Sequence, residues 1–131
     1  MMKKLEEDIR KHLVERGWDT LRPSDLSKSI MIEGAELLEL FQWENKELED
    51  IKNDKKKLGE ISKELADVFI YALDLSVSLG LDTEKLIRSK LAEVVKKYPA
   101  KLMSKNARKG AGSGADSTYW EIKREHRKKG K

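Results

Sequence analysis

The sequence predicts an all-α protein with four main helices. Apolar residues recur at helical spacing in four segments, no segment alternates as a strand would, and turn residues separate the segments. The chain has 131 residues, which is enough for one domain that buries a proper core.

The first helix is expected over residues 3–16, where apolar side chains repeat on one face, and Gly17 should end it. A loop with a proline follows. The second helix is expected over residues 26–48, and Ser24 or Asp25 should be its N-cap.

The third helix is expected over residues 58–79, after a polar turn around Asn53, and it should end at Gly80. A fourth helix is expected over residues 83–98, because a proline follows it directly. These helices place a helical domain over residues 1–103.

Residues 104–131 are expected to form a basic C-terminal tail. A Gly/Ser-rich stretch opens the tail and predicts flexibility, and the last residues could form a short helix. Lysine and arginine interleave here with Tyr119 and Trp120, a pattern that also occurs in nucleic-acid-binding segments. We do not expect nucleic acid as a partner, because such an end is more often a solvated tail or a subunit contact.

Composition excludes several classes of protein. The chain has no cysteine, so disulfides and thiolate metal sites are excluded. No apolar run approaches the roughly 20 residues of a membrane span, and the first residues lack the apolar region of a signal peptide. A cytoplasmic protein without a membrane partner is therefore expected.

The third helix predicts an oligomer. In the stretch ELADVFIYALDLSVSLGL, apolar residues lie on nearly every side. A helix that is apolar all round is buried all round, and a single bundle of this size leaves little room for that. We expect a second copy of the chain to cover one face.

Two pairs of acidic residues lie inside these apolar helices. Glu33 and Glu36 are one helical turn apart, and Glu64 and Asp67 repeat the spacing on the third helix. Trp43 is predicted on the same side of the second helix as Glu33. Four carboxylates on facing helices would repel one another unless a divalent cation shared their charge. Oxygen ligands favour Mg²⁺, with Mn²⁺ as the alternative.

Two other interpretations of the acids need comparison. Acids three residues apart also arise by chance on solvated faces of a chain with 40% charged residues, and the residues alone leave this open. A di-iron bundle needs a histidine three residues after a glutamate on two helices. His12 and His126 do not have that spacing on these helices, so this interpretation is disfavoured.

The segments EGAELLELFQW, KELADVFIYALDL and SKLAEVVKKYPAKL resemble, in this order, the MazG-like all-α nucleoside triphosphate pyrophosphohydrolases, and within them the dCTP pyrophosphatase branch. The resemblance covers roughly residues 5–103. It implies a bundle assembled as a dimer or dimer of dimers. It also implies Mg²⁺-dependent hydrolysis of a nucleoside triphosphate to a monophosphate and pyrophosphate, which removes surplus nucleotides. The catalytic and metal-binding residues would be Glu33, Glu36, Glu64 and Asp67.

The resemblance also implies a set of substrate contacts. Trp43 corresponds to a base-contacting tryptophan, and Trp18 could line the same pocket. Phosphate contacts are implied at the fourth helix, and Arg22 could assist. Each of these also has a plain structural interpretation, as a core, interface or surface residue. The implied substrate-binding residues are Trp18, Arg22, Trp43, Lys90, Lys97 and Tyr98.

Two positions depart from the family pattern. Ile32 stands where many relatives have a further acid, an absence that the dCTP branch shares. Val94 stands where relatives commonly have a nucleotide-contacting asparagine, so a polar contact that bears on the sugar or base preference is lost. Val94 and the basic tail also motivate an alternative function, a helical protein that binds nucleotides or nucleic acid without turnover.

Overall fold

Every element in the described part of the chain is a helix. The computed structural model describes the backbone of residues 1–107 and 114–130, and the side chains of residues 1–103 and 119–130. The predicted all-α class is confirmed, and no strand occurs in these ranges. The helices are α1 (Met2–Glu15), α2 (Pro23–Glu39), α3 (Leu48–Lys52), α4 (Lys55–Ser78), α5 (Thr83–Lys97), α6 (Ala100–Ala107) and α7 (Gly114–Lys128).

The chain divides into two compact units, residues 1–84 and the residues from Lys85 onward. The assignment of a domain to residues 1–103 and a tail to residues 104–131 stays a prediction. The Gly/Ser-rich stretch that predicts flexibility falls largely on residues 108–113, outside the described residues.

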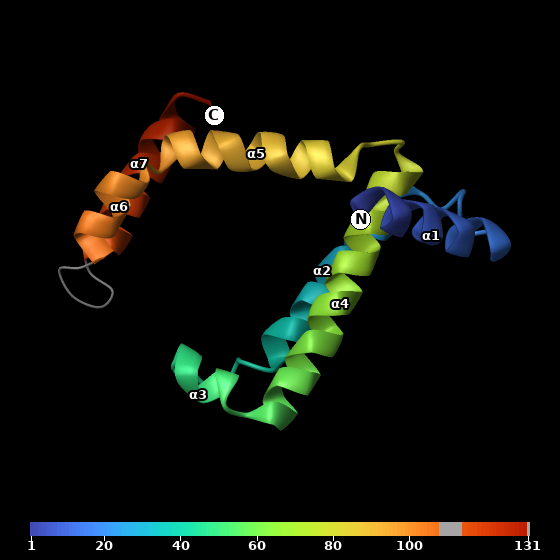
Figure 1. Ribbon diagram of the computed structural model, residues 1–131, viewed down its shortest axis with the longest axis horizontal. Coiled ribbons are helices and arrows are strands. Elements are labelled where there is room, and N and C mark those ends of the chain that lie inside the picture. Colours follow the sequence, from blue (N-terminus) through green and yellow to red (C-terminus); the bar gives the residue numbers. More distant parts are fainter. Residues whose placement is uncertain (108–113, 131) are drawn as a thin grey trace. The chain divides into compact units, whose positions relative to one another are not determined.

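In the first unit, α2 lies along α4, and α1 packs against the C-terminal half of α4 (Figure 1). Ile9 and Leu13 of α1 are buried against Val77 of α4, and Leu73 packs beside them. Burial of these side chains fixes α1 on α4 and leaves the central part of α4 to face α2.

Glycine ends two helices as the sequence predicts. Gly17 follows α1 with φ of 67°, and Gly80 follows α4 with φ of 68°, a backbone conformation that side chains disfavour. The chain then enters α5, where the Thr83 amide donates to Glu6 Oε1 at 2.9 Å and Thr83 Oγ1 lies 2.7 Å from Ser76 Oγ. These bonds join α1, α4 and the start of α5.

Three predicted helix boundaries are wrong. The second helix ends at Glu39 and not near residue 48, and a short helix, α3, precedes α4. The N-cap of α2 is Arg22, with Pro23 in the first turn, so neither Ser24 nor Asp25 caps this helix. α4 begins at Lys55, because Asp54 Oδ1 accepts a hydrogen bond from the Lys57 amide and caps the helix.

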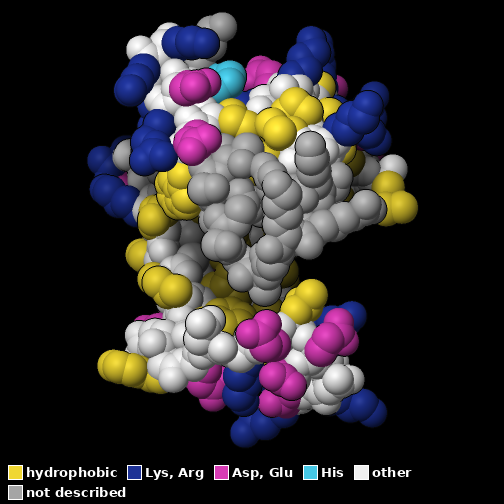
Figure 2. All heavy atoms as spheres, turned by 90° about the vertical axis from the view of Figure 1, so that its left-hand side faces the viewer, with side chains coloured by type: hydrophobic (Ala, Val, Ile, Leu, Met, Phe, Trp, Pro, Cys, Tyr) yellow, Lys and Arg dark blue, Asp and Glu magenta, His cyan; other side chains and the backbone are white. Residues whose placement is uncertain are grey.

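Large apolar side chains remain on the surface of the single chain. On α4, Phe69 is 60% exposed and Ile70 is 42% exposed, so the helix is not covered on every side. Hydrophobic side chains also reach the surface between acidic and basic ones in the space-filling view (Figure 2). No helix within the described ranges is long and apolar enough to span a membrane.

In the second unit, α6 packs against α7 (Figure 1). The ring of Tyr98, just after α5, stacks on Tyr119 of α7 with centroids 4.9 Å apart, and Tyr119 meets Trp120 edge-on. Lys123 lies over both Tyr119 and Trp120. The described part of the C-terminal segment is thus a helix held by aromatic contacts.

Candidate active site

The α2–α4 interface brings three of the four predicted acids together. Glu33 comes from α2, and Glu64 and Asp67 come from α4, and each is half-buried. One carboxylate oxygen of each lies within 4.8 Å of the others. The fourth acid, Glu36, is exposed and lies outside this group, although its carboxyl hydrogen-bonds that of Glu33. The three-residue spacing puts Glu64 and Asp67 on one stripe of α4 that faces Glu33 of α2, whereas the predicted convergence of all four acids is met by these three alone.

The clustered carboxylates concentrate negative charge, which a bound cation would offset. Burial raises the pKa of Glu33, and the hydrogen bond to Glu36 and the charges of Glu36, Asp67 and Glu64 raise it further. Each of these causes disfavours the charged form of Glu33, and a bound cation would act in the opposite direction. Three carboxylate oxygens at this spacing are a ligand set that suits a hard divalent cation.

Trp43 lies elsewhere than predicted. Because α2 ends at Glu39, Trp43 sits in the turn after the helix and not on its acid-bearing face. Its side chain is 87% exposed. It lines a shallow surface hollow of about 450 Å³ whose other walls are Phe41, Gln42, Glu44 and Asn45. An exposed aromatic ring beside a hollow can stack on a flat ligand.

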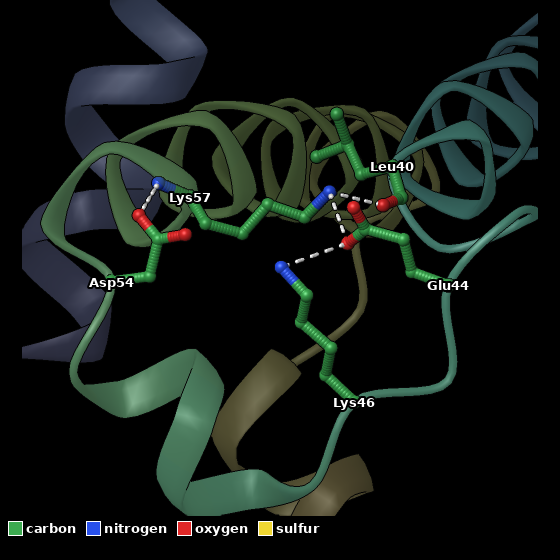
Figure 3. Close-up of polar contacts among 5 residues, drawn as sticks. All are labelled: Leu40, Glu44, Lys46, Asp54 and Lys57. Atoms are coloured by element: carbon green, nitrogen blue, oxygen red, sulfur yellow. Dashed lines mark hydrogen bonds and ion pairs between the residues drawn. The ribbon is translucent and has the colours of Figure 1, made fainter.

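Lys57 was not among the residues predicted from the sequence, and it contacts this turn (Figure 3). Its ammonium group donates to the carbonyl oxygen of Leu40, lies 3.5 Å from Glu44 Oε2, and sits over the ring of Phe41. Lys57 precedes Glu64 by seven residues, so it lies on the same stripe of α4. The seven-residue spacing between Lys57 and Glu64 was the only indication in the sequence. Lys57 is the last of three consecutive lysines, so the pattern did not distinguish it from its neighbours.

Trp18 and Arg22 lie in the loop between α1 and α2. The Trp18 amide donates to the carbonyl of Leu13, and its ring meets His12 edge-on with centroids 5.7 Å apart. Arg22 Nε donates to Asp25 Oδ2 at 2.9 Å, and its side chain is largely exposed. Trp18 is therefore packed on α1, while Arg22 is paired within the start of α2.

The remaining predicted substrate contacts lie in the second unit. Lys90 Nζ donates to Glu93 at 2.8 Å, and Lys97 lies over the ring of Tyr98. Burial raises the pKa of Tyr98, and the neighbouring Tyr119 raises it further. These residues are described within their own unit, so their part in substrate binding stays a prediction.

Comparison with known families identifies the class to which this fold and acid cluster belong. The family model for the MazG-like family matches residues 28–111. The chain belongs to the MazG-like family, and the resemblance inferred from the sequence is confirmed.

Curated relatives place the chain near the dCTP pyrophosphatases. It is 30% identical over 109 residues to human dCTP pyrophosphatase 1, covering 79% of this chain and 64% of the human one. The rat protein of the same name is 31% identical over 102 residues, covering 73% of this chain and 60% of the relative. The chain thus spans less than two thirds of the length of these relatives.

A solved structure supports the same fold. A pyrophosphatase from Archaeoglobus fulgidus superposes with a TM-score of 0.64 and 36% identity, and the match covers 75% of this chain and 92% of the other.

Proposed function

We propose that this protein is a Mg²⁺-dependent nucleoside triphosphate pyrophosphohydrolase. The observation that carries the proposal is the convergence of Glu33, Glu64 and Asp67 oxygens within 4.8 Å between α2 and α4. The similarity to dCTP pyrophosphatases and to a solved pyrophosphatase supports the same reaction. The reaction breaks the bond between the α-phosphorus and the oxygen that bridges to the β-phosphate, with water as nucleophile.

Each acid has a place in this scheme. Glu33, Glu64 and Asp67 would hold the cation, since their oxygens already lie together. When bound, Mg²⁺ neutralises phosphate charge and lowers the pKa of a bound water. Glu36 is exposed beside Glu33, so it can orient the attacking water and accept its proton. Positioning and charge then account for most of the catalysis, as in other phosphoryl transfers.

The substrate would be a nucleotide whose base stacks on Trp43. The exposed indole and the neighbouring hollow give a flat ligand a place to bind. Arg22, Lys90, Lys97 and Tyr98 are proposed phosphate contacts, and Trp18 is proposed to line the pocket. We propose dCTP as the preferred substrate, because the curated relatives carry that name.

The working unit would be a homodimer or homotetramer in the cytoplasm. Phe69 and Ile70 on α4 are exposed in the single chain, and a second copy would remove their apolar surface from water.

A nucleotide panel tests the proposal. The wild-type protein is incubated with each canonical ribo- and deoxyribonucleoside triphosphate, with Mg²⁺ or with a chelator, and pyrophosphate release is measured. We expect release that requires Mg²⁺ and is fastest with dCTP. Binding without release from any nucleotide would favour the alternative of a non-catalytic nucleotide-binding protein.

A further inference from the structure

Lys57 is an unusually buried lysine. Its side chain is 15% exposed, whereas Lys11 and Lys28, which also form ion pairs, keep more than half of theirs in solvent. Burying an ammonium group costs free energy unless acceptors surround it. Lys57 therefore has a specific structural task.

Its acceptors all belong to the turn after α2 (Figure 3). The carbonyl of Leu40 lies at the C-terminal end of the helix, where carbonyl groups lack partners within the helix and carry the negative end of its dipole. Glu44 Oε2 lies 3.5 Å from the ammonium, and Lys46 lies 3.6 Å from the same oxygen. The Lys57 ammonium also lies over the ring of Phe41, with its nitrogen 5.7 Å from the ring centroid.

These contacts flank Trp43 in the sequence. Leu40 and Phe41 precede it and Glu44 follows it, so a single side chain on α4 fixes the turn on both sides of the indole. Trp43 is 87% exposed, so packing around its own ring contributes little to its orientation. The backbone of the turn therefore sets where the ring lies. Lys57 holds that backbone through the Leu40 carbonyl, together with the hydrogen bonds from the Phe41 amide to Leu38 and from the Glu44 amide to Phe41.

We propose that Lys57 is a positioning residue that holds the Trp43 turn and thereby strengthens binding of the nucleobase. The inference rests on the proposed function for its substrate. Lys57 lies two turns of α4 before Glu64, about 10 Å along the helix axis. It thus anchors the base-binding turn to the same helix that carries two of the three clustered acids.

A direct phosphate contact by Lys57 is disfavoured by its surroundings. The ammonium already has a carbonyl, a carboxylate and an aromatic face around it, and little of the side chain reaches solvent. A phosphate-binding lysine would affect every triphosphate alike, whereas a lysine that positions Trp43 affects the affinity for the base.

The test compares Lys57→Met, which keeps the length of the side chain without its charge, with Lys57→Arg, which restores a cation. Lys56→Met is the matched control, because Lys56 is the exposed neighbour. Steady-state pyrophosphate release gives KM and kcat for the nucleotide that wild type turns over best. We expect Lys57→Met to raise KM by about tenfold, the range that loss of a base–aromatic stack produces, and to change kcat by less than about twofold. Arginine should restore KM, and Lys56→Met should match wild type.

A second measurement needs no turnover. In a background with Trp18→Phe and Trp120→Phe, the fluorescence anisotropy of Trp43 reports the motion of the turn in the nucleotide-free protein. We expect lower anisotropy in Lys57→Met and recovery in Lys57→Arg. This arm still tests the contact if wild type turns over no nucleotide, so failure of the proposed function is distinguished from failure of the inference.

Several results would overturn the inference. These are unchanged anisotropy in Lys57→Met, lower anisotropy without a rise in KM, or a loss of kcat with KM retained. Should Lys57→Met fail to fold by circular dichroism, Glu44→Gln serves instead, since it removes the carboxylate and leaves the lysine. We expect the same changes in Glu44→Gln, reduced in size, and their absence would contradict the inference.

Discussion

Glu33 of α2 and Asp67 of α4 face each other across the helix interface with carboxylate oxygens within 4.8 Å, and Glu64 completes the group. Burial and the negative charges of its neighbours raise the pKa of Glu33, and like charges this close destabilise the protein when no cation is bound. The arrangement costs stability unless a cation or a proton enters it. The acids that would bind the cation therefore lower the stability of the cation-free protein. Variants of single acids can measure the effect on turnover and the effect on stability separately.

Replacing Asp67 with asparagine should remove turnover and leave the fold intact. We expect Asp67→Asn to lower kcat/KM for pyrophosphate release by on the order of 100-fold or more, because a ligand to the cation is lost. Its melting temperature without Mg²⁺ should equal or exceed that of wild type, since one like charge is gone. Glu60→Gln, an exposed carboxylate on the same helix, is the control. Full activity in Asp67→Asn would refute the site.

Glu36→Gln should separate catalysis from cation binding. Because Glu36 lies outside the three-oxygen group, we expect its variant to lose turnover by on the order of 100-fold while still binding the cation. Isothermal titration with Mg²⁺ or Mn²⁺ measures the binding. Equal loss of cation binding in Glu36→Gln and Asp67→Asn would instead make Glu36 a ligand.

Mg²⁺ should stabilise the protein without any nucleotide. A cation that binds only the folded state at 100 times its Kd adds about 2.7 kcal/mol to the free energy of unfolding. We expect the melting temperature to rise with Mg²⁺ concentration in wild type and to rise much less in Asp67→Asn. An identical rise in both proteins would indicate binding elsewhere.

Trp43 should matter for affinity more than for chemistry. We expect Trp43→Ala to raise KM by about tenfold, because a stacking surface for the base is lost, and Trp43→Phe to keep most of the affinity. Pyrophosphate release over a range of dCTP concentrations measures both constants. Should alanine and phenylalanine behave alike, the ring does not stack on the base.

Asp74 should make stability depend on pH. It is 6% exposed, and its Oδ1 has no hydrogen-bond partner within the described residues. Burial raises the pKa of Asp74, while the charge of His12 on α1 opposes the shift. The folded state therefore binds this proton more tightly than the unfolded state, and the associated stability is lost as the pH rises from about 3.9 through the folded pKa.

Asp74→Asn tests this dependence. At pH 7 we expect the variant to exceed wild type in free energy of unfolding by on the order of 1 kcal/mol, because the buried charge is gone. The difference should shrink toward pH 4. Urea denaturation at both values measures it, with the exposed Asp50→Asn as control. A difference that grows on acidification would contradict the assignment.

The sequence alone determined the helical class, the spacing of the acids and the glycine stops. These features are local, since a helical repeat or an αL glycine depends on residues within a turn or two of one another. Glu33, Glu36, Glu64 and Asp67 could thus be named as candidates from their three-residue spacing on two apolar helices, but that spacing did not show that Glu36 lies outside the close group.

Only the tertiary structure decided where α2 ends and what holds the turn that carries Trp43. The apolar pattern continues past Glu39, although the helix ends there. Lys57, 17 residues beyond Leu40, donates a hydrogen bond to the carbonyl at the end of α2. Asp54 caps the N-terminus of α4. Burial of Asp74 under α1 likewise depends on a partner far along the chain. Side-chain pairs of this kind form between segments whose separation no local pattern encodes, so their energies appear only once the helices pack.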